Sequence, residues 1–219
     1  MDKIIVFDID GTLFNSNTTF DFLEFYFKRN TIYTIYKHLY NNIIWRCFNK
    51  IIKKLFRKDI TRIIAIRFLK GKNRNDLKIA SELFYDDFLV GRNNKDVMNR
   101  FIYLSSTYKN IYLVSATLDF LGDIISEKLQ CMNLLTSIIS YDGNHCNGIL
   151  CKDLLGHKLE ALISESIEVP FLSVYTDDFT DIGILEKSIE KNVIVNKKTK
   201  SQWEKIIKKN VWSANIWEI

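Results

Sequence analysis

Four short runs of β-branched and aromatic residues, spread over the length of the chain, constrain its fold more than any other feature. They are KIIVF at residues 3–7, IYLVS at 111–115, FLSVY at 171–175 and NVIVN at 192–196. Uninterrupted apolar runs of this length are typical of strands buried on both faces of a parallel sheet. Residues 118–131, 154–167 and 181–191 show helical patterns between the later runs. This alternation predicts an α/β protein with a Rossmann-like, doubly wound parallel sheet.

The first two of these strands are separated by about a hundred residues that lack strand alternation. Apolar residues recur there at helical spacing, and they are Ile32, Ile35, Tyr36, Leu39, Ile43, Phe48, Ile51, Ile52 and Leu55. Two more helical stretches cover residues 76–88 and 95–108, and a strand pair is expected around the turn-forming residues 141–149. We therefore predict a core of residues 1–15 and 104–219 and a helical cap of residues 16–103.

Composition and charge narrow the class of protein. The chain has 219 residues, of which 47% are apolar and 26% charged, as expected for a folded protein. No run of about 18 apolar residues indicates a membrane span, and residues 1–10 do not read as a signal peptide, so we expect a cytoplasmic protein. The net charge is +5, but residues 22–72 carry thirteen Lys and Arg against two acidic residues. The basic charge is therefore concentrated in the predicted cap.

Polar side chains follow the predicted strands at the edge where an open α/β sheet binds its ligands. They are Asp8 and Asp10 after the first strand, Ser115 at the end of the second, and Asp177, Asp178 and Asp181 after the third, with Lys158 on the first turns of a helix. Several converging carboxylates repel one another and need a cation. Oxygen ligands combined with phosphate and water suit Mg²⁺. The pattern indicates a magnesium-dependent phosphoryl-transfer site.

The spacing of the first two aspartates suggests that one is a nucleophile and the other a general acid and base. Asp8, at the strand end, is placed to attack an electrophile, while Asp10 can protonate a leaving group and later deprotonate water. Gly11 gives the backbone freedom to turn, and the Thr12 hydroxyl can fix that turn. Two alternatives stay open at this point. Ser115 can instead cap the following helix, and Lys158 can instead be a solvated surface lysine.

The segments FDIDGTLF, VSATLD, GHKLEAL and YTDDFTDIGIL resemble the four ordered motifs of the haloacid dehalogenase superfamily of phosphatases. The resemblance is strongest to the phosphoserine phosphatase-like branch, whose members carry a small helical cap. Two departures are visible: Gly156 and Lys158 lie one residue closer than in that branch, and Thr176 and Asp178 stand where glycine and serine are common.

The resemblance implies a role for each motif residue. Asp8 would be the phosphoryl acceptor and Asp10 the general acid and base. Asp8, the backbone carbonyl of Asp10 and Asp177 would hold Mg²⁺, with Asp181 in support. The residues implied for catalysis or substrate binding are Asp8, Asp10, Gly11, Thr12, Ser115, Ala116 and Lys158. The expected function is a Mg²⁺-dependent phosphatase that hydrolyses a small phosphomonoester through an aspartyl-phosphate intermediate.

The basic cap leaves the substrate open. Its lysines and arginines can simply be the solvated face of amphipathic helices. With the interleaved aromatic residues they can instead contact anionic lipid, and the cap resembles bacterial lipid phosphatases that act on phosphatidylglycerophosphate. A lipid phosphatase at the inner membrane face is therefore one alternative function, and a non-catalytic module that binds a phosphorylated ligand is another. Nucleic acid is not expected as a partner, because no recognisable binding module is present.

Overall fold

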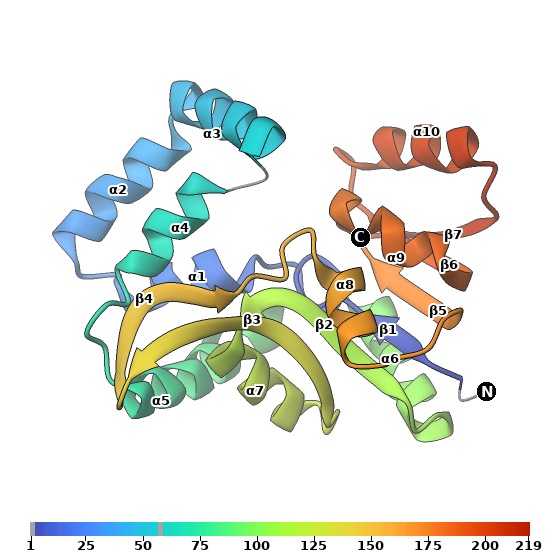
Figure 1. Cartoon of the computed structure of the whole chain (residues 1–219), viewed down its shortest axis with the longest axis horizontal. Coiled ribbons are helices and arrows are strands. Elements are labelled where there is room, and N and C mark those ends of the chain that lie inside the picture. The colour runs from blue at the N-terminus through green and yellow to red at the C-terminus, as the bar shows by residue number, and fades with distance from the viewer. Residues whose placement is uncertain (1–2, 57–58) are drawn as a thin grey trace.

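A sheet of seven strands, in the order β4-β3-β2-β1-β5-β6-β7, forms the centre of the protein (Figure 1). The computed structural model describes residues 3–56 and 59–219. The strands are β1 (Ile5–Phe7), β2 (Ile111–Leu118), β3 (Asn133–Asp142), β4 (His145–Lys152), β5 (Phe171–Thr176), β6 (Ser188–Val195) and β7 (Ala214–Glu218). All neighbouring strands are parallel except β3 and β4, which form an antiparallel hairpin. The predicted α/β fold with a mostly parallel sheet is confirmed.

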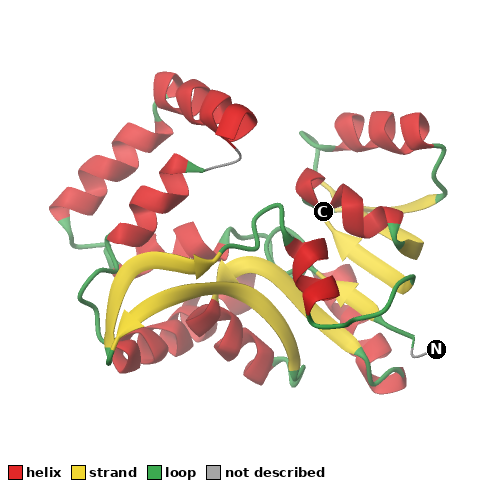
Figure 2. Cartoon of the chain, in the orientation of Figure 1, coloured by secondary structure: helices red, strands yellow, loops and turns green. Residues whose placement is uncertain are grey.

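Helices cover both faces of the sheet (Figure 2). One face carries α1 (Thr18–Tyr26), α5 (Arg74–Phe84), α6 (Lys95–Thr107) and α7 (Asp119–Lys128), and the other carries α8 (Lys158–Ser164), α9 (Ile182–Glu186) and α10 (Lys200–Asn210). The central strand β1 is buried on both sides, since Ile5 and Phe7 join the first layer and Val6 joins the second. This burial explains the uninterrupted apolar run in its sequence.

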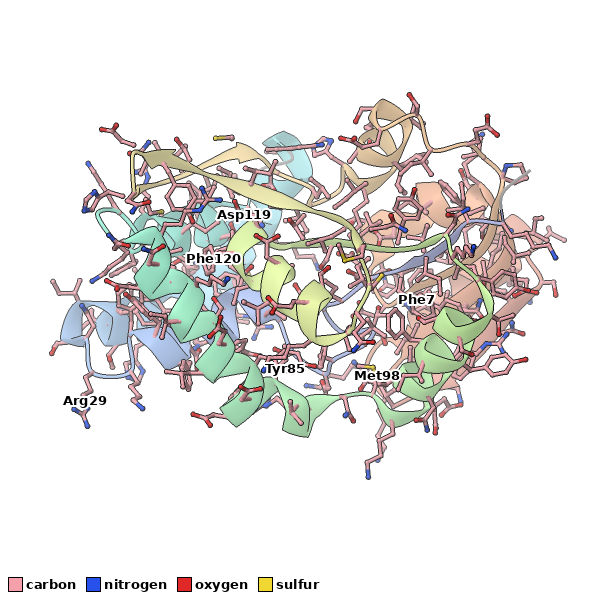
Figure 3. The ribbon with its side chains drawn as sticks, turned by 90° about the horizontal axis from the view of Figure 1, so that it is seen from below. Phe7, Arg29, Tyr85, Met98, Asp119 and Phe120 are labelled. Carbon is pink, nitrogen blue, oxygen red and sulfur yellow. The ribbon has the colours of Figure 1, made fainter. Side chains whose placement is uncertain are left out.

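The face that carries α6 and α7 is seen from below in Figure 3. Phe7 of β1 stacks on Tyr175 of β5, with ring centroids 4.1 Å apart. The ring of Phe101, one turn of α6 after Met98, meets Phe7 edge to face at 5.2 Å. Offset-stacked and edge-to-face pairs stabilise aromatic cores beyond their buried area. These contacts fix the strand that carries Asp8 at its end.

Three further helices between β1 and β2 stand together beyond one end of the sheet (Figure 1). They are α2 (Thr31–Asn41), α3 (Ile43–Phe56) and α4 (Ile60–Arg67). A π-helical turn (Tyr85–Leu89) and a 3-10 turn (Val90–Arg92) join α5 to α6. The helical character expected between the first two strands is present. Within the predicted cap of residues 16–103, α1, α5 and the first part of α6 contribute apolar residues to the core on one face of the sheet, and so do α2, through Tyr33 and Tyr36, and α4, through Ala65 and Ile66.

The C-terminal part of the chain differs from the sequence prediction. The helix predicted over residues 181–191 ends at Glu186, and the strand predicted from residue 192 begins at Ser188. Ser188 and Glu190 pair with Phe171 and Ser173 of β5, so the polar start of this strand is held by backbone hydrogen bonds along its buried neighbour. The helix α10 and the edge strand β7 were not predicted at all. The predicted hairpin around residues 141–149 is confirmed, with strands that extend further on both sides.

Candidate active site

The carboxyl ends of β1, β2 and β5 meet at a cavity of about 520 Å³. β1 is the switch point of the sheet, because the chain leaves it toward β2 on one side and β5 lies on the other. The predicted site residues that line this catalytic pocket are Asp8, Asp10, Gly11, Ser115, Ala116, Lys158 and Asp177. Predicted site residues as far apart in the sequence as Asp8 and Asp177, which are separated by 169 positions, are therefore brought together at one edge of the sheet.

Lys158, the first residue of α8, is buried between two carboxylates. Its Nζ lies 2.9 Å from Oδ1 of Asp8 and 2.7 Å from Oδ2 of Asp181. Burial lowers the pKa of a lysine, but the attraction of Asp181 and Asp8 outweighs it and holds the pKa of Lys158 above its ordinary value. Lys158 is therefore a charged ammonium inside the site. The alternative of a solvated surface lysine is wrong.

The carboxylates of the site are unusually easy to protonate. Burial, followed by mutual repulsion, raises the pKa of Asp8 and that of Asp181, although Lys158 opposes the rise in both. Burial raises the pKa of Asp177 to about 7, with repulsion from Asp178 as the next cause. Burial also raises the pKa of Asp10. Lys158 and Arg62 are two cations against the five aspartates named here, so the site has room for a further positive charge.

The loop after β1 is held in one conformation. Oδ1 of Asp10 accepts a hydrogen bond from the backbone N–H of Thr18, 2.9 Å away, at the start of α1. The hydroxyl of Thr12 accepts one from the backbone N–H of Asp177 at 3.1 Å, so Thr12 ties the loops after β1 and β5 together and does not line the pocket. Its expected contact with substrate stays a prediction.

Gly11 lets the carboxylate of Asp177 approach the backbone. Its φ is +66°, a conformation that favours glycine, and a Cβ at this position would lie 2.1 Å from Oδ2 of Asp177. No side chain fits there without displacing that carboxylate. The glycine of the first motif is therefore explained by the position of an aspartate in the fourth.

Ser115 lies within β2 and is fully buried. Its Oγ accepts a hydrogen bond of 3.3 Å from the backbone N–H of Thr117, and the helix α7 begins only at Asp119. The alternative in which Ser115 caps the following helix is therefore wrong. The backbone carbonyl of the next residue, Ala116, is already occupied, because it accepts a hydrogen bond from Arg62.

Arg62 is a pocket residue that the sequence analysis missed. It lies on α4, is 5% exposed, and lines the catalytic pocket. Its guanidinium donates to the carboxylate of Asp153, to the carbonyl of Ala116 and to Oγ of Ser137. Arg62 thus fastens a helix of the insert to the sheet. One local signal was available, since Asp59 caps α4 by accepting from the backbone N–H of Arg62, but nothing in the sequence separates this arginine from the other basic residues nearby.

A family model of haloacid dehalogenase-like hydrolases matches residues 5–186, which include all four motifs. The chain belongs to this family. The assignment made from the four sequence motifs is confirmed, and the protein is a hydrolase of the haloacid dehalogenase type. A comparison of the sequence with curated proteins gives no match.

Solved structures with the same fold include several hydrolases. A protein with unknown function from Bordetella pertussis Tohama I has a TM-score of 0.71 at 16% identity, with 98% of each chain covered. A phosphoserine phosphohydrolase-like protein from Francisella tularensis gives 0.64 at 16% identity, covering 98% of this chain and 94% of that one. A phosphoserine phosphatase, in a phospho-aspartyl intermediate analogue, gives 0.53 at 19% identity, covering 99% and 93%. These likenesses show the fold that the hydrolase shares with them.

The site of this hydrolase fits the divalent cation that its family uses. The carboxylates of Asp8, Asp10 and Asp177 line the pocket, and hard oxygen donors of this kind are the ligands that Mg²⁺ prefers. Within the described chain, no three Asp, Glu, His or Cys side chains form a metal cluster. Mg²⁺ does not require one, since it is usually held by one or two carboxylates with phosphate and water completing the shell. Asp8 and Asp177, with the backbone carbonyl of Asp10, are the residues that would hold it.

Proposed function

We propose that this hydrolase is a Mg²⁺-dependent phosphatase that cleaves phosphomonoesters by transferring the phosphoryl group to Asp8. The observation that carries the proposal is the position of Asp8: its carboxylate is buried at the end of the central strand, contacts Lys158, and faces a cavity that Asp10 also lines. A carboxylate in this setting can act as a nucleophile. Mg²⁺, when bound, supplies positive charge beside the phosphoryl oxygens.

In the first step a carboxylate oxygen of Asp8 attacks phosphorus, and the bond from phosphorus to the alcohol oxygen breaks. Asp10 gives its proton to that oxygen, so that a neutral alcohol leaves. The raised pKa of Asp10, caused mainly by burial, favours the protonated form that this step needs. The hydrogen bond that Asp10 accepts from Thr18 directs its carboxyl group.

In the second step Asp10, now a carboxylate, accepts a proton from water. The water oxygen attacks phosphorus, the bond between phosphorus and Asp8 breaks, and inorganic phosphate leaves as the Asp8 carboxylate is restored. We assign Ser115 as a hydrogen-bond donor to a phosphoryl oxygen and Lys158 as the fixed positive charge that offsets Asp8 and phosphate. Positioning and charge neutralisation supply most of the rate in such a site.

The test is phosphate release from a panel of phosphomonoesters with Mg²⁺, for the wild type, Asp8→Asn and Asp142→Asn. Asp142 is an exposed aspartate at the end of β3 that does not line the pocket, so it is a control outside the site. We expect Asp8→Asn to abolish turnover and Asp142→Asn to retain it. Equal activity in the wild type and Asp8→Asn would contradict the mechanism. Absence of turnover in a folded wild type that binds Mg²⁺ and phosphate would favour the non-catalytic binding module.

We also propose a narrower cap than residues 16–103. The helices α2 and α3 lie beyond the sheet (Figure 1), and α4 connects them to it, because Ala65 and Ile66 of α4 are buried in the same core as Leu77 of α5 and Phe101 of α6. Arg62 joins the projecting helices to the edge of the catalytic pocket. Residues 30–67 are therefore the part of the insert that we expect to cover a substrate. Limited proteolysis should cut within this segment before it cuts the core, and equal rates of cleavage in the segment and in the core would contradict the division.

A second candidate, a phosphatase acting at a lipid surface, is favoured by one observation on the cap. Two adjacent helices expose a row of large apolar side chains, each between 49% and 77% exposed. We call it the α2–α3 stripe, and its members are Ile32, Ile35, Leu39, Ile43, Ile44, Phe48, Ile51 and Leu55. The buried side of α2 is formed instead by Tyr33 and Tyr36. An exposed apolar patch of this kind marks an interaction site in a folded protein.

Charge around the stripe fits an anionic bilayer. Lys28, Arg29, Arg46 and Lys50 are exposed near it, and Figure 3 shows Arg29 pointing away from the protein. Arg57 and Lys58, which belong to the same basic segment of the sequence, lie outside the described residues. In the described ranges no helix is long and apolar enough to cross a membrane. Interfacial binding through an amphipathic face needs no such helix.

Co-sedimentation with vesicles tests the lipid-surface proposal. We expect binding to phosphatidylglycerol-containing vesicles that weakens with salt, and loss of binding in the double variant Ile44→Glu/Ile51→Glu. The control is Ile102→Glu/Ile163→Glu, because these isoleucines are similarly exposed at 58% and 56% on α6 and α8. Equal binding by both double variants, or a stripe that instead mediates self-association in solution, would contradict the proposal.

A further inference from the structure

A second cavity, of about 480 Å³, lies between α4 and β4. Half of its lining is aliphatic, formed by Ile63, Ile66, Ile149, Leu150 and Leu155, and the rest consists of Gly148 and the polar residues Asp59, Arg67, Asp153 and His157. We call it the α4–β4 cavity. Its size falls within the range of about 300–1,000 Å³ that is typical of small-molecule sites, which are usually apolar with a few polar groups at one side. The catalytic pocket differs, since carboxylates, amides and hydroxyls dominate its lining.

The two cavities share part of their walls. Asp59 and Leu155 line both of them. On α4, Arg62 lines the catalytic pocket and the next residue, Ile63, lines the α4–β4 cavity. The α4–β4 cavity is therefore adjacent to the catalytic pocket, with Asp59 and Leu155 at the boundary between them. Its position suits a group attached to a phosphate that is bound in the catalytic pocket.

The walls of the α4–β4 cavity are held in place from both sides. Gly148 of β4 lies so close to the end of α4 that a Cβ there would be 3.0 Å from Cα of Arg67. The other part of α4 is fastened through Arg62 to Asp153 and Ala116. Because strand and helix are fixed to each other, the chamber is formed before any ligand arrives, and binding does not need to order it.

We propose that the α4–β4 cavity binds a hydrocarbon group on the alcohol side of the substrate, so that the preferred substrates are amphiphilic phosphomonoesters. This inference rests on the proposed function. Ile149, which is 59% exposed in the cavity wall, would be covered by such a group. Burial of each additional methylene group is expected to strengthen binding by about threefold to fourfold.

The experiment measures kcat/KM for ethyl, butyl, hexyl and octyl phosphate, each below its micelle-forming concentration and without vesicles. The variant Ile149→Gln is compared with Ile189→Gln, because Ile189 is an isoleucine of similar exposure (63%) on β6, away from the cavity. We expect kcat/KM to rise steeply with chain length in the wild type and in Ile189→Gln. In Ile149→Gln the dependence on chain length should be several-fold weaker over the series.

A second measurement tests hydrocarbon binding independently of the proposed phosphatase reaction. The affinities of ethyl, butyl, hexyl and octyl phosphonate, which carry no cleavable ester, are measured by calorimetry with the same three proteins. Turnover of ethyl phosphate with no dependence on chain length would overturn the inference and leave the proposed function standing. The opposite result has two parts: no phosphomonoester is turned over, and the phosphonate affinities rise with chain length in the wild type and in Ile189→Gln but not in Ile149→Gln. That result would support the inference and contradict the proposed function. A chain-length dependence unchanged in Ile149→Gln would place the hydrocarbon elsewhere and overturn the inference.

Discussion

The ammonium nitrogen of Lys158 lies 2.9 Å from Oδ1 of Asp8, and both side chains are at most 5% exposed. Asp8 directly follows the central strand and Lys158 begins a helix 150 residues later, so this contact exists only in the folded chain. It places a permanent positive charge beside the proposed nucleophile. The stability of the protein and the chemistry of the site therefore depend on the same ion pair.

Replacement of Lys158 by Met is expected to reduce the free energy of unfolding by about 3–5 kcal/mol, because it leaves Asp8 and Asp181 buried without their cation. Urea denaturation without Mg²⁺ measures the change. The matched control is Lys152→Met, whose ion pair with Glu165 spans 3.9 Å between exposed side chains and should be worth less than about 1 kcal/mol. Similar losses in the two variants would show that the buried ion pair does not stabilise the fold.

Replacement of Gly11 by Ala should damage the site beyond its backbone cost. A residue with a Cβ at positive φ costs about 1–3 kcal/mol, and Gly11 and Gly71 share this cost, with φ values of +66° and +78°. Only at Gly11 does the added Cβ collide with Asp177, whereas nothing lies within 4 Å at Gly71. We therefore expect Gly11→Ala to lose Mg²⁺ affinity, measured by calorimetry, and Gly71→Ala to keep it. Retained affinity in both would mean that Asp177 is not a ligand.

Asp119, at the start of α7, is expected to make the free energy of unfolding depend on pH (Figure 3). Burial raises its pKa from 3.8 to about 6 in the folded protein. Between these values the native state binds more protons than the unfolded state, so the contribution of Asp119 to stability falls as pH rises from about 4 to 6.

The variant Asp119→Asn removes this contribution. The difference between its free energy of unfolding and that of the wild type, both measured by urea denaturation, should therefore shift in favour of the variant as the pH rises from about 4 to 6. Asp142→Asn, an exposed position at the end of β3, is the control and should show no such trend. If the wild type instead became more stable relative to Asp119→Asn as the pH rises, the prediction would be contradicted.

Arg62 is expected to hold α4 against the sheet. The variant Arg62→Met loses charged hydrogen bonds to Asp153, Ala116 and Ser137, each typically worth about 1.5–3 kcal/mol, and the partly exposed Asp153 contributes least. We predict a loss of at least about 2 kcal/mol in chemical denaturation and faster proteolysis of the α2–α4 region. Arg46→Met, at an exposed position on α3, should change stability by about 0.5 kcal/mol or less. Equal proteolysis of the two variants would count against the role of Arg62.

The sequence predicted the part of the site that lies at strand ends. Asp8, Ser115 and Asp177 could be found because a parallel sheet brings the carboxyl ends of its strands to one edge, whatever the loops between them do. The order of the four motifs made the family recognisable. Two of the predicted site residues do not line the pocket. Thr12 binds the backbone N–H of Asp177 and so supports the loop after β1, and Asp181 contacts Lys158 from behind.

Other features depend on contacts that local sequence does not encode. Arg62 is one of thirteen basic residues between positions 22 and 72, and only tertiary packing turns it inward. The helix α10 buries a single residue, Trp203, and the edge strand β7 buries none fully, so neither has a clear apolar period. The first half of β6 is polar and lacks strand alternation, so the sequence analysis assigned it to the preceding helix. Weak periodicity, together with long-range packing, limited the prediction at these places.

The most direct test of the account is to locate the phosphoryl group on the protein. The wild type and Asp8→Asn are mixed with substrate and Mg²⁺, quenched in acid within the first turnover, digested and analysed by mass spectrometry. We predict that the peptide containing residues 4–13 of the wild type gains the mass of one phosphoryl group at Asp8, and that Asp8→Asn gains none. Phosphate released by a wild type that is never modified at Asp8, or a phosphoryl group found on another residue, would contradict the central claim.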